Sequence, residues 1–283
     1  MFRTYKYPLR PKDEQTKQLD FLVCQSRLVY NLALEQRITT YRETGKGIGY
    51  RAQWEYFRDM RRDHPDMLGQ VNASSLQHLL RRLDKSFAAF FRRLKEGEKP
   101  GYPRFKSRNR FHSIEYTYGD GCKLHQDEYG RLSFYVQNVG EIRMCYHRAV
   151  PAGARIKHAV VKRFSDRWYV CLMLELPDPE KRQILTGQKV GIDLGLKSLA
   201  TLSSGELIEN PRWLRENLAN LRRIQRHASR QIKGSRRQHK TYCQIARLHE
   251  QVANQRADYL HKVSTRLVAE NDLIALKTSN SDS

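Results

Sequence analysis

One carboxylate in the second half of the chain stands where it could bind a metal ion. Asp193 lies in the run 190–202, with apolar residues on both sides, and Gly191 and Gly195 leave room for close backbone approach. The turn Ser203-Ser204-Gly205 that follows predicts a buried hairpin with Asp193 at its centre. A carboxylate that meets a second acid could hold divalent ions for phosphodiester chemistry. A capped turn or a solvated Asp in an ordinary strand would explain the same residues, because one such motif is a weak signal.

Cations are concentrated near the turn of a predicted helical hairpin over residues 211–270, with almost no acids among them. These cations would repel one another unless a phosphate partner bound there, although a charge run is often only a solvated face. We therefore predict contacts with an RNA or DNA backbone from the following residues. They are Arg222, Arg223, Arg226, Arg230, Lys233, Arg236, Arg237 and Lys240.

A loop rich in Pro, Gly, aromatic residues and cations spans residues 96–108. Such a loop could follow a phosphate backbone while its aromatic rings stack on bases, which makes Arg104 and Lys106 candidate backbone contacts. A Pro-rich linker that Tyr102 and Phe105 attach to a domain explains the composition equally well.

The composition of the chain favours a polyanionic partner. Its 283 residues include 52 Lys and Arg against 30 Asp and Glu, for a net charge of +22, which matches nucleic acid. An anionic membrane surface is the competing partner, but the sequence has no long apolar span, signal peptide or lipidation motif. The five cysteines are widely spaced, without a Cys-x-x-Cys pair for zinc, and are expected to be reduced. We therefore expect a cytoplasmic protein of about two domains, with no membrane partner.

The first hundred residues predict one strand and three amphipathic helices. Residues 3–9 alternate as an edge strand that is closed by Pro8 and Pro11. The first helix has an apolar stripe over 19–34, with Arg37 on its other face, and ends at Gly45. The second runs from Tyr50 to about residue 62, and the third has a core stripe over 76–94 that includes Phe91 and Leu94.

The remaining elements predict an α/β protein of more than one domain. Several β-segments lie between residues 113 and 176, and the last two form a hairpin across Ser165-Asp166. With the N-terminal strand they predict a small barrel that the helices interrupt, followed by a domain boundary at 177–180. After the Asp193 hairpin, Asn210 is expected to cap the helical hairpin with Pro211 at the first helical position. A buried strand is expected over 273–276.

Five motifs occur together and in order along this chain. The segments 191–195, 208–211, 233–235, 247–256 and 101–106 resemble those of TnpB, a family of transposon-encoded RNA-guided DNA nucleases related to type V CRISPR effectors. The resemblance implies a β-barrel (wedge) domain over 1–10 and 101–180, with a helical recognition bundle inserted over 11–100. It also implies a truncated RuvC-like domain of the RNase H fold over 187–283, which contains the basic helical hairpin.

By the same resemblance the partners would be a guide RNA and a double-stranded DNA target with a short adjacent motif. The family's motif-reading positions fall on Tyr50, Gln77 and Thr117. Gln77 is expected near the start of the third helix, where its amide could make a bidentate contact with adenine.

The chain also departs from the family pattern. Lys277 stands where the family carries a catalytic Glu, and no zinc ribbon or third catalytic Asp follows, since Asp282 is too close to the preceding strand to replace that Asp. Cleavage with two metal ions needs several carboxylates. We therefore expect Asp193 to be vestigial, with no catalytic residue, no functional divalent-metal or zinc site, and no enzymatic activity.

These features together predict an RNA-guided DNA-binding protein that lacks nuclease activity and acts as a programmable transcriptional repressor at the bacterial nucleoid. One alternative is a TnpB endonuclease present as a C-terminally truncated fragment. Another is a basic RNA-binding protein without a guide function. The guide, the target and the oligomeric state do not follow from the sequence.

Overall fold

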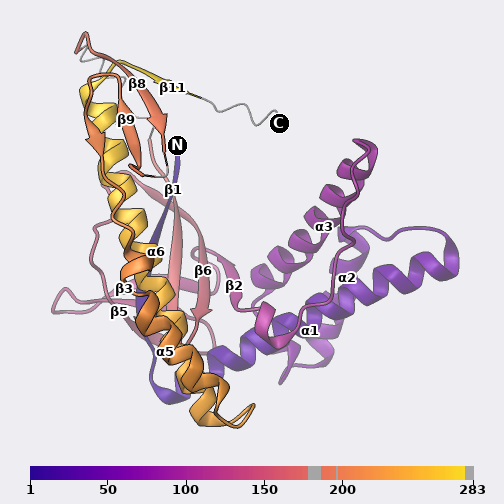
Figure 1. Cartoon of the computed structure of the whole chain (residues 1–283). Helices are drawn as coiled ribbons and strands as arrows, with labels where there is room; N and C mark the ends of the chain where they lie inside the picture. The colour runs from indigo at the N-terminus through magenta and orange to yellow at the C-terminus, as the bar shows by residue number, and fades with distance from the viewer. Residues whose placement is uncertain (178–185, 196, 278–283) are drawn as a thin grey trace. The chain divides into compact units, whose positions relative to one another are not determined.

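The structure is a computed structural model that describes residues 1–177, 186–195 and 197–277. The chain divides into two compact units, Met1–Asp178 and Pro179–Ser283. The first unit contains a seven-stranded sheet and three long helices, and the second contains a four-stranded sheet and a helical hairpin (Figure 1). The α/β class is therefore confirmed. The predicted boundary at 177–180 lies outside the described residues except for Pro177.

The three helices of the first unit begin and end close to the predicted positions. They are α1 (Asp13–Thr44), α2 (Tyr50–Asp63) and α3 (Ala73–Lys95). α1 ends at Gly45, whose φ of 67° lies in the left-handed region and lets its N–H donate to the Tyr41 carbonyl at 2.9 Å. Short 3₁₀ turns follow at η1 (Leu68–Gln70) and η2 (Arg108–Arg110).

The apolar stripe of α3 is shorter than predicted. Its buried residues run from Ser74 to Phe87. Phe91 and Leu94 are 57% and 54% exposed, so their assignment to the core is wrong. Apolar residues continue at helical spacing along α3 beyond the point where the neighbouring helices cover this face.

Arg37 was predicted on the polar face of α1, and this prediction is also wrong. Its side chain is buried, where its guanidinium donates to Gln53 Oε1 at 2.7 Å and to Asp84 Oδ1 at 2.8 Å. Gln53 in turn donates to the Ala33 carbonyl at 2.7 Å. A buried charge is tolerated here because these partners replace its water.

The strands of the first unit form one antiparallel sheet in the order β2-β6-β7-β1-β5-β4-β3. The sheet curls into a half-barrel, and among the described residues its outer strands β2 and β3 do not pair with each other, so the predicted barrel is open. The hairpin across Ser165-Asp166 is confirmed, since Phe164 pairs with Arg167. The strands are β1 (Phe2–Arg10), β2 (Ser113–Thr117), β3 (Cys122–Gln126), β4 (Leu132–Val136), β5 (Gly140–Met144), β6 (Arg155–Phe164) and β7 (Arg167–Glu175).

β1 is a central strand, so its assignment as an edge strand is wrong. It pairs with β7 along its length and with β5 only at Leu9 and Arg10. The carbonyl of Pro8 faces β5, where it accepts from Cys145 N at 2.9 Å. Proline has no backbone N–H, and an N–H at this position would point to the same side as the carbonyl. Pro8 therefore lies where the ladder of hydrogen bonds with β5 ends.

The second unit has a mixed sheet in the order β10-β9-β8-β11, in which β11 runs parallel to β8. The first arm of its helical hairpin begins at Trp213 and not at Pro211, because Arg212 adopts a φ of 47° before the helix starts. None of the helices in the described part of the chain is long and apolar enough to cross a membrane. The elements are β8 (Lys189–Leu194), β9 (Ala200–Leu202), β10 (Leu207–Ile208), α4 (Trp213–Glu216), α5 (Leu218–Ser229), α6 (Arg236–Glu270) and β11 (Leu273–Leu276).

Candidate functional site

The first candidate site lies in the second unit, where the parallel pairing of β8 and β11 brings Asp193 and Lys277 together. The register joins Leu276 to Ile192, and the Lys277 N–H donates to the Ile192 carbonyl at 3.0 Å. Lys277 Nζ then lies 3.3 Å from Asp193 Oδ2. Both side chains are exposed, the carboxylate by 56%, so the prediction that Asp193 is buried is wrong. Asp193 lies towards the end of its strand, where the last two residues are exposed.

The described residues around Asp193 do not fit a two-metal site. Divalent ions at such a site need several carboxylates, and in the described ranges Asp193 belongs to no group of three metal-ligating side chains. Its carboxylate is instead paired with an ammonium group. Asp282, considered above as a substitute acid, lies outside the described residues.

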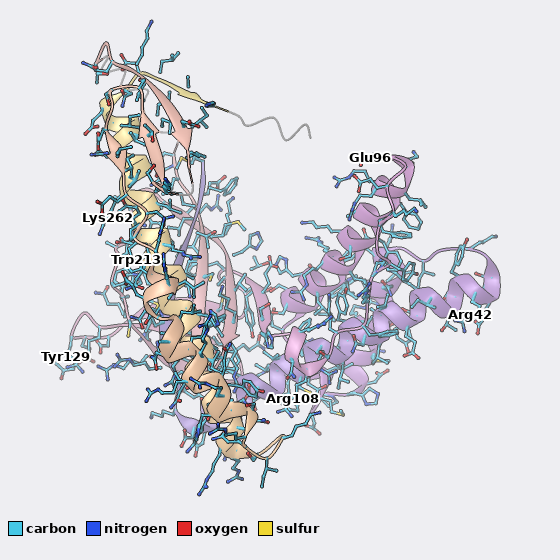
Figure 2. All side chains as sticks on the ribbon, in the orientation of Figure 1. Arg42, Glu96, Arg108, Tyr129, Trp213 and Lys262 are labelled. Carbon is cyan, nitrogen blue, oxygen red and sulfur yellow. The ribbon has the colours of Figure 1, made fainter. Side chains whose placement is uncertain are left out.

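The second candidate site is the basic tip of the α5–α6 hairpin, defined as the eight cations predicted from the sequence between Arg222 and Lys240. All eight are exposed, and Figure 2 shows side chains projecting outward along this end of the hairpin. Within the described residues none of them forms an ion pair with an acid. Gly234, with a φ of 81°, makes the turn between the helices, and Ser235 caps α6 by accepting from Gln238 N at 3.1 Å.

The loop after α3 is anchored at two points. The Tyr102 ring lies 5.5 Å from the ring of Phe87 and 5.3 Å from that of Phe90, which supports its predicted attachment to a domain. The backbone of Lys106 donates to Asn31 Oδ1 at 2.8 Å and accepts from Asn31 Nδ2 at 3.1 Å.

The two candidate cations of this loop differ in their freedom. The Lys106 side chain is half-buried, with its Nζ 5.6 Å from the centre of the Tyr30 ring. Arg104 is exposed and has no ion pair among the described residues. Of the two, Arg104 is therefore free to meet a phosphate, whereas Lys106 already contacts an aromatic face.

The three predicted motif-reading residues lie on different elements of the first unit. Tyr50 begins α2, and its ring faces the guanidinium of Arg81 at 5.3 Å. Gln77 lies on α3, one turn before Arg81, and makes no hydrogen bond within the described residues. Thr117 ends β2, and its hydroxyl lies 2.9 Å from His78 Nε2. Gln77 is thus available to a ligand, whereas the Thr117 hydroxyl already has a partner.

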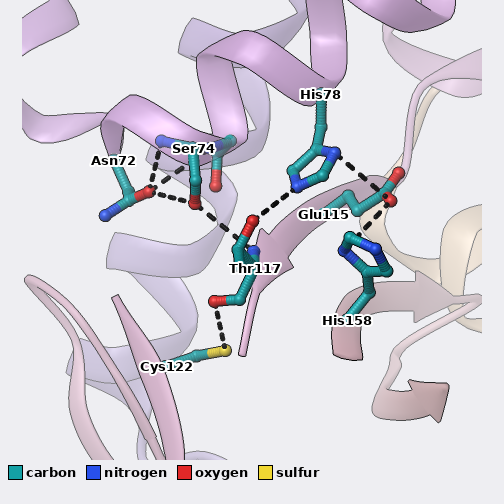
Figure 3. A network of polar contacts seen from close by, with 8 residues as sticks. Asn72, Ser74, His78, Glu115, Thr117, Cys122 and His158 are labelled. Atoms are coloured by element: carbon teal, nitrogen blue, oxygen red, sulfur yellow. Dashed lines mark hydrogen bonds and ion pairs between the residues drawn. The ribbon is translucent and has the colours of Figure 1, made fainter. Parts of the chain in front are cut away.

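A polar network joins the start of α3 to β2 (Figure 3). Asn72 caps α3 by accepting from Ser74 N at 2.8 Å and Ser75 N at 3.3 Å, and its amide donates to Asp120 and Gln137. Ser74 Oγ in turn accepts from Thr117 N at 3.3 Å. These contacts fix the position of α3, and with it Gln77, on the sheet.

The same network contains a cluster that the sequence analysis missed. His78 Nδ1 lies 3.5 Å from Glu115 Oε1, and His158 Nδ1 lies 4.0 Å from the same oxygen. The three residues come from α3, β2 and β6 and are far apart in the sequence, so no local motif signals them. Burial lowers the pKa of His78, and the charges of His158, Arg81 and Lys85 lower it further, against the opposing effect of Glu115.

The fold and these surfaces define a class: a basic α/β protein with an exposed, acid-free cation cluster suited to a nucleic-acid backbone. Family comparisons identify the group within this class. A family profile described as "Probable transposase" matches residues 171–280, and a related one described as "Helix-turn-helix domain" matches 1–46. The chain belongs to this IS605 OrfB family, also called TnpB, as the resemblance predicted.

Curated relatives match nearly all of the chain. A protein of Streptomyces pristinaespiralis named "Putative RNA-guided DNA endonuclease" is 34% identical over 97% of this chain. InsQ of Escherichia coli K12, which carries the same description, is 29% identical over 98% of the chain. The chain spans 66% of the length of the first relative and 67% of the second.

A solved structure has a similar fold. It is the Cas12f1 chain in a cryo-EM structure of a complex with sgRNA and target DNA, with a TM-score of 0.56 over 95% of this chain and 65% of that chain. The sequence identity is 16%, so the likeness concerns the fold.

The comparisons correct one prediction. The chain was expected not to be an enzyme, because Lys277 replaces an acid. The relatives that cover nearly all of it are named as endonucleases, so that expectation is wrong. The replacement of one expected acid is a narrower signal than similarity over nearly the whole chain.

Proposed function

We propose that this protein binds a guide RNA and uses it to recognise a double-stranded DNA target, within the RNA-guided endonuclease activity for which its relatives are named. The observation that carries the proposal is the 34% identity over 97% of the chain to such a relative. The acid-free basic tip supports it, because a polyanion would relieve the repulsion among its cations.

In this proposal affinity and sequence choice come from different groups. The basic tip and Arg104 contact the backbone of the guide and of its duplex with target DNA, which provides affinity irrespective of sequence. Base pairing by the guide selects the target. Gln77, with Tyr50 nearby on α2, reads the short adjacent motif through base edges.

The proposal includes DNA cleavage as part of the activity for which the relatives are named. Divalent ions supply charge stabilisation and an activated water in such a reaction. The described residues around Asp193 do not fit those ions, so no cleavage step is assigned to them, and the role proposed for the basic tip, Arg104 and Gln77 is to bind and position the nucleic acids.

A second role, repression of transcription by occupancy of a promoter, is favoured by the ion pair between Asp193 and Lys277. In this pair the Lys277 ammonium group lies 3.3 Å from the Asp193 carboxylate and offsets its charge. Occupancy of a guide-matched site would obstruct a polymerase whether or not the strand is cut.

The guided function can be tested with RNA that co-purifies with the protein. We expect one uniform RNA species, and replacing its target-matching segment should move the DNA-binding site to the new match without any change to the protein. A heterogeneous RNA population, or DNA binding that ignores the guide, would leave a basic RNA-binding protein instead. For repression, a reporter with a scrambled target beside an intact motif should lose repression.

A further inference from the structure

We infer that His78, Glu115 and His158 form a binding site for a divalent transition metal of the zinc class in the first unit. The three ligand atoms lie within 4.8 Å of one another, and two imidazoles with one carboxylate form a common ligand set for such ions. The inference is independent of the proposed guide function.

The ligand distances are close to those of a tetrahedral site. Bonds of about 2.0–2.1 Å to nitrogen and oxygen place the ligands of a tetrahedron roughly 3.3 Å apart. The observed separations from Glu115 Oε1 are 3.5 Å to His78 and 4.0 Å to His158. The two imidazole nitrogens lie within 4.8 Å of each other, so side-chain shifts of up to roughly 1.5 Å would complete the geometry.

The sheet aims two of the ligands at each other. His158 lies directly across from Thr117 in the β2–β6 register, so it shares a face with Glu115, two residues away. A register shift between Ile156 and His158 leaves Lys157 as an extra residue in β6. Such bulges redirect the side chains beside them and are common next to functional sites.

The hydrogen bonds leave the ligand atoms free for a metal. His78 Nε2 lies 2.9 Å from the Thr117 hydroxyl, an outer contact of the kind that fixes the orientation of a metal-binding imidazole. With that nitrogen protonated, Nδ1 presents its lone pair towards the Glu115 carboxylate (Figure 3). His158 Nδ1 is buried and makes no hydrogen bond in the described structure. A cation among these three atoms would satisfy all of them.

The charges around the site indicate what would occupy the fourth position. A cavity of about 500 Å³ adjoins the cluster, and its lining includes four cations and the second acid Glu175. Lys157 is paired with Glu175 at 2.9 Å. The remaining cations lower the affinity for a bare dication but favour an anionic oxygen as its fourth ligand. The four cations of the lining are Arg81, Arg82, Lys85 and Lys157.

The site can be tested by cobalt titration of the purified full chain, freed of nucleic acid. We expect one Co²⁺ per chain, with visible absorption of a tetrahedral nitrogen and oxygen site that Zn²⁺ abolishes. Glu115→Gln and His158→Ala should each raise the Kd by more than about 100-fold, since loss of an outer partner alone costs about 10–100-fold. Thr117→Val should fall in that outer range.

His125→Ala is the matched control, because His125 lies 3.2 Å from Glu141 without a second imidazole in a comparable cluster. Its Co²⁺ binding should equal that of the wild type. If a variant fails to fold, X-ray absorption of the zinc-loaded wild type decides, with two imidazoles and no sulfur expected. Absence of saturable binding, binding unchanged in both ligand variants, or thiolate ligation from the free cysteines would overturn the inference.

Discussion

The network at the start of α3 and the basic tip of the α5–α6 hairpin are both rich in polar groups, but they satisfy those groups differently. In the network, Thr117 donates to Ser74 and Ser74 donates to Asn72, which is buried. At the tip, eight exposed cations have no acid partner within the described residues. The first arrangement stabilises one conformation of the protein, whereas the second leaves charge available to a polyanion. We therefore expect substitutions in the network to change the stability of the fold, and substitutions at the tip to change nucleic-acid binding and its salt dependence.

The largest effect is expected at the basic tip. Replacing Arg226, Arg230 and Arg237 with Ala should weaken binding to every guide and target alike. It should also flatten the dependence of log K on log salt by about one unit for each lost phosphate contact, or about three in all. Binding measured by fluorescence anisotropy over a salt series checks this.

A control with the same change of charge replaces Arg51, Arg92 and Lys262 with Ala. Each of these exposed cations pairs with an acid four residues away in the sequence. If the control lowers affinity and salt dependence as much as the tip variant, the tip is not a distinct binding surface.

Asn72→Ala should destabilise the first unit by about 2–3 kcal/mol. The substitution removes a helix cap and leaves buried partners without hydrogen bonds. Urea unfolding measures this loss, and the salt dependence of RNA binding should stay unchanged. Asn72→Ser retains a capping oxygen and should recover part of the stability. A large change in salt dependence would contradict the distinction between the two regions.

Gln77→Ala should reduce target affinity by about 1–3 kcal/mol and relax the preference at one base pair of the adjacent motif. Gln77 shares a feature with each region. The network fixes its helix, as it fixes Asn72, but the amide of Gln77 has no partner in the described structure, as the cations of the tip have no acid partner. A library of motif variants bound by the guide-loaded protein measures the preference. Ser86→Ala, also on α3, should leave it unchanged. A uniform loss over all motifs would instead indicate a phosphate contact at Gln77.

The smallest effect is expected from Asp272, which joins the start of β11 to the segment before β8. Hydrogen bonds from Thr186 and Gly187 lower the pKa of its carboxyl below the ordinary 3.8. The ionised form is therefore favoured by folding, and its contribution to stability is present above pH 3.8 and is lost as the pH falls through the lower folded value. Thermal unfolding of Asp272→Asn should show a weaker dependence on acid than the wild type, and equal dependence would exclude this role.

Local patterns predicted much of this structure. The helix periodicity and Gly45 predicted α1, the hairpin across Ser165-Asp166 is present, and the family resemblance rested on contiguous motifs. Errors arose where long-range packing decides. Arg37 is buried only because Gln53 and Asp84 come from other helices to meet it, and Pro8 lies in a central strand because the adjoining ladder ends beside it.

The candidate site divides in the same way. The basic tip lies in one stretch of sequence, so charge counting could find it. The pairing of Asp193 with Lys277 depends on the register of β11 against β8, which no local pattern specifies. The cluster of His78, Glu115 and His158 depends on three elements at once, and its residues taken singly are ordinary.

The central position of β1 also has a consequence for the order in which the parts of the first unit can fold during synthesis. β1 precedes its main partner β7 by more than 150 residues and must wait for it, since the two strands pair from Phe2 to Leu9, whereas α1–α3 can form from local contacts. Until β7 is synthesised, β1 lacks a partner along most of its length and could pair with another nascent chain. Deleting it would divide the sheet into two separate pieces, β2-β6-β7 and β5-β4-β3, because β1 is the strand that joins them.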